Sequence, residues 1–169
     1  MPVSLFSFIN LFDRQLDNAA NLLTKGAQHA KDGGHSEEEM LNWRLIGDMH
    51  PLSFQIQVVC NFVRQWPARV AGLPVPADFD PRTDVAGWHG AIAEAKAYLA
   101  ALTPGQFEGR DDVPLTYMLG NGLEPTLPSA QWLTVFATTN IYFHLSTAYG
   151  ILRHKGVPLG KIDFFAGGL

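Results

Sequence analysis

The sequence predicts an all-α protein built as a four-helix bundle. Four long segments repeat apolar residues at three- and four-residue steps, which is the period of a helix with one buried face. Clusters of proline and glycine separate these segments, as expected of the connections between helices. The chain of 169 residues has about the length of one domain, so we expect residues 1–169 to fold as a single domain.

The first half of the chain predicts two long helices with a short one between them. The first long helix is expected over about residues 4–31, before a pair of glycines. Ser36 and Glu39 form a capping box that opens a short helical turn. Proline is favoured at the first position of a helix and glycine just after its end, so the second long helix is expected from Pro51 to Gly72.

The second half predicts two further long helices and a long connection. Three prolines make residues 73–81 an extended linker, and the third helix is expected over about residues 84–102. Residues 106–128 show no helical period, but Gly120-Asn121-Gly122 within them is typical of a small hairpin or an ordered flap. The last helix is expected from a cap at Ser129 to about His154. We therefore expect a bundle with a long crossing connection that carries the hairpin.

The last helix carries two polar side chains on its apolar face. Asn140 and His144 are four residues apart, so their side chains lie on the same face of the helix. Buried polar groups need hydrogen-bond partners, and Gln55, at the edge of the second helix's apolar stripe, is better placed for this than Gln57. With Thr147, these inward-facing residues are expected either to line a small ligand-binding cavity or to form a purely structural network.

A metal centre is a more specific alternative function for this cavity. Zinc and nickel take about three ligands of the His, Asp, Glu or Cys type, whereas Asn140 is a weak neutral ligand. His50, beside a proline at a helix start, could turn toward the end of the bundle. We expect no cofactor, with zinc or nickel as the alternative, because three other histidines are expected to be solvated (His29, His35 and His89).

Composition and charge exclude several classes of protein. Twelve Lys and Arg against 16 Asp and Glu give a net charge of −4, without the basic surplus that nucleic acid or an anionic membrane would attract. A lone cysteine, Cys60, cannot form an internal disulfide, and no apolar run reaches the ~18 residues that span a bilayer. The apolar N-terminal run has no basic residue before it and no cleavage site after it, so we expect a cytoplasmic protein.

Some apolar residues fall outside the helical stripes. The chain is 47% hydrophobic and only 17% charged, which excludes intrinsic disorder and leaves a thinly charged surface. Aromatic side chains in the flap and the tail need cover, so we expect a homodimer; the aromatic residues outside the stripes are Phe107, Tyr117, Phe164 and Phe165.

Two segments resemble signatures of a known family. The run from Asn140 to Val157, with Gly160 to Phe164 after it, closely resembles a family of uncharacterised bacterial proteins allied to the DinB/YfiT-like superfamily. The segment from Arg44 to Leu52, with Gln55 and Gln57 following, is similar to a second signature of that family. The resemblance covers nearly the whole chain and implies a DinB-like four-helix bundle that is commonly dimeric.

The resemblance also implies where a metal would be bound. The superfamily includes metal-dependent enzymes, such as thiol transferases, with a site of three histidines. Their positions correspond here to His144, Asn140 and a residue near Gln55, so two of the three are carboxamides. We therefore expect a dimeric bundle that keeps a polar, metal-free cavity around His144, and the alternative is a metal-dependent transferase or hydrolase of the DinB/YfiT-like type.

Overall fold

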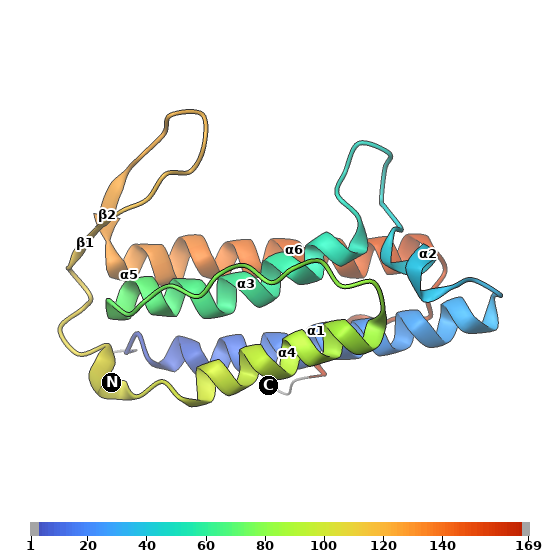
Figure 1. The fold of residues 1–169 in the computed structure, drawn as a ribbon, viewed down its shortest axis with the longest axis horizontal. Coiled ribbons are helices and arrows are strands. Elements are labelled where there is room, and N and C mark those ends of the chain that lie inside the picture. The colour runs from blue at the N-terminus through green and yellow to red at the C-terminus, as the bar shows by residue number, and fades with distance from the viewer. Residues whose placement is uncertain (1–3, 167–169) are drawn as a thin grey trace.

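The computed structural model describes residues 4–166 and consists mainly of four long helices packed side by side (Figure 1). α3 packs against α4 and α6, and α1 packs against the same two helices. This confirms the predicted bundle, although residues 1–3 and 167–169 of the expected domain lie outside the described residues. The long helices are α1 (Ser7–Asp32), α3 (Leu52–Ala71), α4 (Val85–Ala100) and α6 (Thr138–His154).

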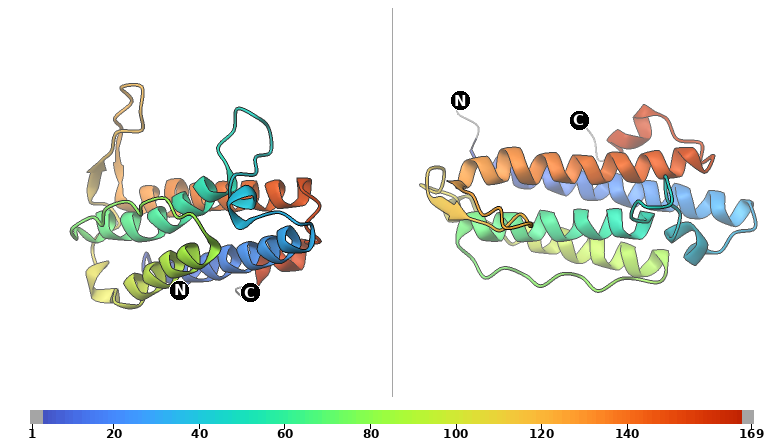
Figure 2. Two further views of the ribbon diagram at one scale, coloured as in Figure 1. Left: turned by 45° about the vertical axis from the view of Figure 1, so that its right-hand side comes forward. Right: turned by 90° about the horizontal axis from the view of Figure 1, so that it is seen from above.

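The directions of the helices determine the connections between them. α1 and α6 run one way along the bundle, and α3 and α4 run the other way (Figures 1 and 2). A short helix, α2 (Glu37–Leu41), and a loop over residues 42–51 connect α1 to its antiparallel neighbour α3. Because α3 and α4 are parallel, the linker over residues 73–84 must run back along the length of the bundle, from the end of α3 to the start of α4. This linker is the long crossing connection of the fold.

Side chains of α3 hold this linker by its backbone. Gln57 Nε2 donates to the carbonyl of Phe79 at 2.6 Å, and Asn61 Oδ1 accepts from the N–H of the same residue at 2.9 Å. Arg64 Nη2 donates to the carbonyl of Ala77 at 2.9 Å, and its guanidinium lies 3.5 Å from the centre of the Phe79 ring. An extended proline-rich segment has no backbone partners of its own, so α3 supplies them.

The predicted hairpin lies in the next connection, between α4 and α6. Strands β1 (Pro114–Thr116) and β2 (Thr126–Pro128) pair antiparallel, with Leu115 opposite Leu127. Asn121, in the expected turn, has a φ of 51°, a left-handed conformation that asparagine tolerates better than most residues. Within residues 4–166 there are also two short 3₁₀ turns, at Pro104–Gln106 and Lys161–Phe165.

The last long helix begins irregularly. A single α-helical turn, α5 (Ser129–Gln131), leads into a π-helix over Trp132–Ala137, which continues as α6. The expectation that Ser129 caps this helix is wrong: its buried hydroxyl donates to the carbonyl of Val113 at 2.9 Å and so fixes the hairpin to the helix. The wider π turn was not predicted, and such turns are frequent at functional sites.

The core is one continuous cluster formed by the apolar faces of the four helices. It includes Phe107, which is only 3% exposed, so the expectation that this aromatic needs an external cover is wrong. Tyr117 also packs inside the molecule, edge-on to Trp66 at 4.9 Å between ring centres. Within residues 4–166, no helix is long and apolar enough to cross a membrane.

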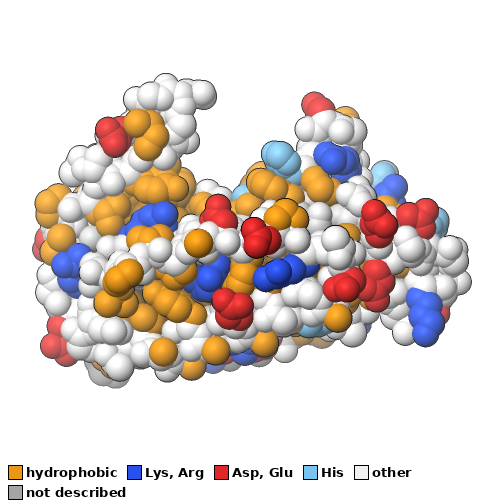
Figure 3. Space-filling model, viewed as in Figure 1, with side chains coloured by type: hydrophobic (Ala, Val, Ile, Leu, Met, Phe, Trp, Pro, Cys, Tyr) orange, Lys and Arg blue, Asp and Glu red, His pale blue; other side chains and the backbone are white. Residues whose placement is uncertain are grey.

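Two loops project from the same side of the bundle, above α3 and α6 (Figure 1). They are residues 42–51 and the hairpin, and a space-filling view shows the surface hollowed between them (Figure 3). Exposed apolar side chains occur in both, and we call this set the two-loop face: Leu45, Ile46, Met118 and Leu123.

Candidate functional site

His144 and Gln55 form the centre of the candidate site. His144 Nδ1 on α6 lies 2.7 Å from Gln55 Oε1 on α3, and Gln55 Nε2 donates to the carbonyl of His50 at 3.1 Å. The carbonyl of His50 can only accept, which fixes the orientation of the Gln55 amide. Nδ1 of His144 therefore carries the ring hydrogen and donates it, and Nε2 is left with a lone pair.

Aromatic rings surround this pair. The Phe54 ring lies edge-on to His144 at 6.1 Å between centres, and His50 stacks on the other side of Phe54 at 3.9 Å. Burial in the first place, and the electrostatic effect of His50 in the second, lower the pKa of His144 to about 4. At neutral pH the imidazole is thus uncharged, and within residues 4–166 its Nε2 has no hydrogen-bond partner.

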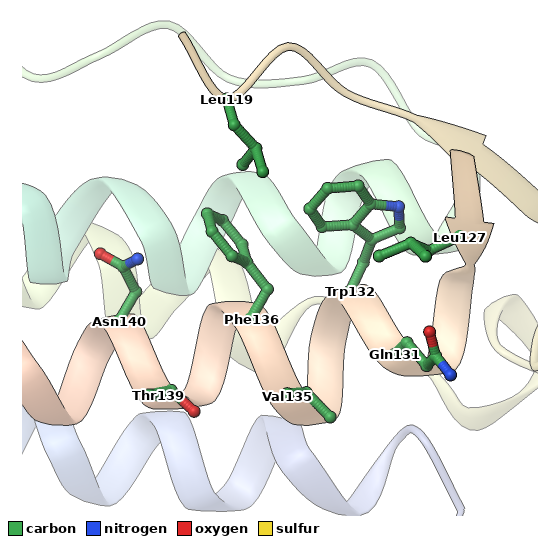
Figure 4. Close-up of a pocket in the computed structure, with 8 residues that line it drawn as sticks. All are labelled: Leu119, Leu127, Gln131, Trp132, Val135, Phe136, Thr139 and Asn140. Carbon is green, nitrogen blue, oxygen red and sulfur yellow. The ribbon is translucent and has the colours of Figure 1, made fainter. Parts of the chain in front are cut away.

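The other two predicted residues lie apart from this pair. Thr147 donates its hydroxyl to the carbonyl of Phe143 at 2.8 Å, within its own helix. Asn140, one turn before His144, lines a separate cavity beneath the hairpin (Figure 4). The structure therefore brings together Gln55 and His144 and places Asn140 and Thr147 outside their hydrogen-bond network.

The residues present do not fit a three-histidine metal centre. Gln55 Oε1 already accepts from His144, and Asn140 supplies only a neutral amide. In the part of the chain that the structure describes, no group of three His, Cys, Asp or Glu side chains is close enough to hold a metal ion. His144 and His50 are the only imidazoles near this point among those described residues, and two ligands fall short of the usual three.

Two further residues contribute to the site: His50, which the sequence offered only as a possible metal ligand, and Phe54, which was not predicted. The His50 carbonyl orients Gln55, and Phe54 separates the rings of His50 and His144. His50 directly precedes Pro51, the N-cap of α3, so its carbonyl lies outside the hydrogen bonds of the helix and can accept from a side chain. Phe54 precedes Gln55 directly, but the sequence carries no signal for the direction of its ring.

A second cavity lies beneath the hairpin and was not predicted at all. Its volume is about 530 Å³, and it lies between Leu119 of the hairpin and the helical segment that runs from the end of α5 through the π-helix into α6 (Figure 4). Its lining combines large apolar side chains with three uncharged polar ones: Leu119, Leu127, Gln131, Trp132, Val135, Phe136, Thr139 and Asn140.

Comparison with known proteins agrees with this architecture. A crystal structure of a DinB family member protein from Shewanella denitrificans superposes with a TM-score of 0.85 at 29% sequence identity, over 93% of this chain and 88% of the other. No curated protein matches the chain. The family model described as "Domain of unknown function (DUF1993)" matches residues 6–165. The chain therefore belongs to the DUF1993 family and has a DinB-like fold.

Proposed function

We propose that this protein is a small-molecule-binding helical bundle that uses His144 as a neutral hydrogen-bond acceptor and needs no metal. The observation that carries this proposal is the 2.7 Å contact of His144 Nδ1 with Gln55, which leaves Nε2 as a free acceptor. Aromatic neighbours reduce competition from water at this atom. A ligand that donates one O–H or N–H group suits this arrangement, and the rings of Phe54 and Phe143 suit an apolar body beside it.

We further propose that the protein is a cytoplasmic homodimer. Large apolar side chains gathered on one face of a monomer are unusual and mark interaction surfaces. The two-loop face has this character, since Ile46 is 62% exposed and Leu123 is 60% exposed on separate projections. Two copies related by a twofold axis would place the 42–51 loop of one beside the hairpin of the other, where Arg44 and Glu124 carry opposite charges. A lone, buried cysteine supports a reducing compartment.

Metal analysis separates this proposal from the metal-dependent alternative. Protein purified without an affinity tag should contain no stoichiometric zinc or nickel, in the wild type and in His144→Ala alike. His154→Ala, at the exposed end of α6, is the matched control. Stoichiometric metal that is lost in His144→Ala and kept in His154→Ala would overturn the proposal in favour of a transferase or hydrolase.

Restoring the two missing histidines tests whether their absence alone explains the expected lack of metal binding. The double variant Gln55→His with Asn140→His restores the three-histidine set that the resemblance implies. We expect this variant to bind about one zinc ion per chain, because histidines at positions 140 and 144 lie one turn apart on one face.

Ligand binding at Nε2 has its own test. Phenol, which offers one O–H donor on an aromatic ring, is expected to shift the Nε2 nitrogen resonance of His144 saturably. His144→Gln has no imidazole to observe, so its control is the resonances of phenol itself, which should show no saturable binding to that variant. A wild-type resonance that does not move at millimolar phenol would contradict the binding role.

A further inference from the structure

We propose that the cavity beneath the hairpin binds a neutral small molecule with a flat apolar body and one hydrogen-bonding group. Its volume of about 530 Å³ lies within the ~300–1,000 Å³ typical of small-molecule pockets. This proposal goes beyond the role of His144, which does not line the cavity, and the two can fail separately.

The floor of the cavity is aromatic and firmly packed. The Trp132 ring stacks on Trp66 at 5.2 Å between centres, and Phe136 lies edge-on to it at 5.3 Å. Trp132 Nε1 donates to the carbonyl of Leu115 at 2.7 Å, so its polar atom is engaged and the ring contributes apolar surface. The π turn at Trp132–Ala137 places both rings at the start of the last helix, where they support a flat ligand.

The polar side chains of the lining are uncommitted. Among residues 4–166, the side chains of Gln131, Thr139 and Asn140 have no hydrogen-bond partner. In Figure 4 the amide of Asn140 points into the space beside Phe136, below Leu119. An amide in this position can bind a carbonyl, hydroxyl or amide of a ligand.

The absence of charge around the cavity limits the class of ligand. None of the residues that line it is Lys, Arg, His, Asp or Glu. An anion or cation would lose hydration there without gaining an opposite charge, which is costly. The lining therefore selects a neutral molecule and disfavours nucleotides, phosphates and charged amino acids.

The hairpin forms the roof of the cavity. Leu119 points down over the aromatic floor (Figure 4), and its N–H donates to the carbonyl of Leu123 at 2.8 Å across the turn. Leu119 is 39% exposed and Val135, on the other wall, is 61% exposed, so a bound apolar body would cover both side chains. Covering such surface is favourable by about 25 cal/mol per Å².

Fluorescence titration with prodan tests this inference on the full-length protein. Prodan is neutral, has a flat naphthalene body and carries one carbonyl acceptor. We expect saturable binding of one molecule per chain with a blue-shifted emission. Asn140→Leu should weaken prodan binding about fivefold, the loss of one neutral hydrogen bond of ~1 kcal/mol. Pyrene, a flat hydrocarbon without a hydrogen-bonding group, should bind the wild type and Asn140→Leu equally well.

Two hairpin variants serve as a matched pair. Leu119→Ser removes the roof and should weaken both probes, whereas Leu123→Ser, on the same hairpin but outside the cavity, should leave both affinities unchanged. A thermal melt of each variant confirms that it is folded. Three results would overturn the proposal: no saturable binding, equal weakening by both hairpin variants, or an apparent Kd that rises as the protein self-associates, which would show that a second copy fills the cavity.

Discussion

The Gln55 amide is held at both of its polar atoms. Oε1 accepts from His144 and Nε2 donates to the carbonyl of His50, while the residue as a whole is only 3% exposed. A group buried in this way loses more when its partner is removed than it gained from the bond, because water cannot replace the partner. The Gln55–His144 hydrogen bond therefore stabilises the fold, and His144 is also a candidate binding group.

Removal of the imidazole should lower stability. We expect His144→Ala to reduce the free energy of unfolding by about 1–3 kcal/mol, because Gln55 Oε1 is left without a donor. Urea denaturation measures this change. Thr147→Ala is the control on the same helix, and it should stay within about 0.5 kcal/mol because its hydroxyl bonds only to its own helix. Equal losses in the two variants would contradict a special role for the pair.

The stability of the protein should fall in mild acid because of the same residue. The pKa of His144 is about 4 in the folded chain and 6.5 as the ordinary value, so the unfolded chain binds a proton first as the pH falls. The part of the free energy of unfolding that depends on a neutral His144 is fully present above pH 6.5 and is lost as the pH falls toward 4. We expect this loss to be about 1 kcal/mol, because the ring is partly exposed and water screens its charge.

The variant His144→Gln isolates this effect, since glutamine does not titrate. The difference in free energy of unfolding between wild type and variant, measured by urea denaturation at several pH values, should shrink between pH 6.5 and 4. A difference that stays constant over this window would contradict the lowered pKa.

The Gln55–His144 contact could be predicted, whereas the roles of Asn140 and Thr147 could not. Helical spacing gives the face on which a side chain lies, and this was enough to select Gln55 over Gln57. Spacing does not say which neighbour a side chain contacts. The Thr147 hydroxyl donates to a carbonyl in its own helix. Asn140 faces a cavity whose roof is formed by the hairpin, which is distant in the sequence.

At the scale of elements, α3 serves both as a core helix and as a support for the linker. Asn61 is central to this, because its Oδ1 accepts from the backbone of Phe79 and from Arg64. The Phe79 side chain is itself 5% exposed, so the linker is anchored by burial as well as by hydrogen bonds.

Loss of the Asn61 side chain should loosen this anchor. We expect Asn61→Ala to lower the free energy of unfolding by about 1–3 kcal/mol, because the Phe79 N–H loses its acceptor. Gln65→Ala, which also removes contacts to the linker but at a more exposed position, should cost less, about 1 kcal/mol or below. Urea denaturation compares the two, and a larger loss in Gln65→Ala would show that the anchor lies elsewhere.

The sequence predicted the long helices to within a few residues at their ends. Apolar periodicity and the capping signals are local, and the Ser36–Glu39 capping box is present as expected. The π turn was not predicted because its apolar residues fit an α-helical pattern as well. The role of Ser129 was misassigned because its acceptor, Val113, is distant in sequence.

At the scale of the whole molecule, the two-loop face is the surface that we propose as the dimer interface. Light scattering at micromolar concentration should report a dimer. Ile46→Glu, on one projection, should shift the protein toward the monomer, because an isologous contact would bury this charge twice. Ile162→Glu is the control, since Ile162 is 83% exposed but lies in the 3₁₀ turn near the C-terminus. A monomeric wild type, or equal effects of both variants, would contradict the proposed interface.

The parallel course of α3 and α4 has an electrostatic consequence. Parallel helices align their dipoles, so two positive ends, each equivalent to about half an elementary charge, meet at one end of the bundle. Two carboxylates bind the N-terminus of α4: Glu37 Oε2 accepts from the N–H of Val85 at 2.9 Å, and Asp84 Oδ1 accepts from the N–H of Gly87 at 2.7 Å. At the opposite end Arg110 Nε donates to the carbonyl of Val70 at 2.7 Å, in the last turn of α3. The long axis of this pair is thus electrically polarised, a property that a net charge of −4 does not reveal.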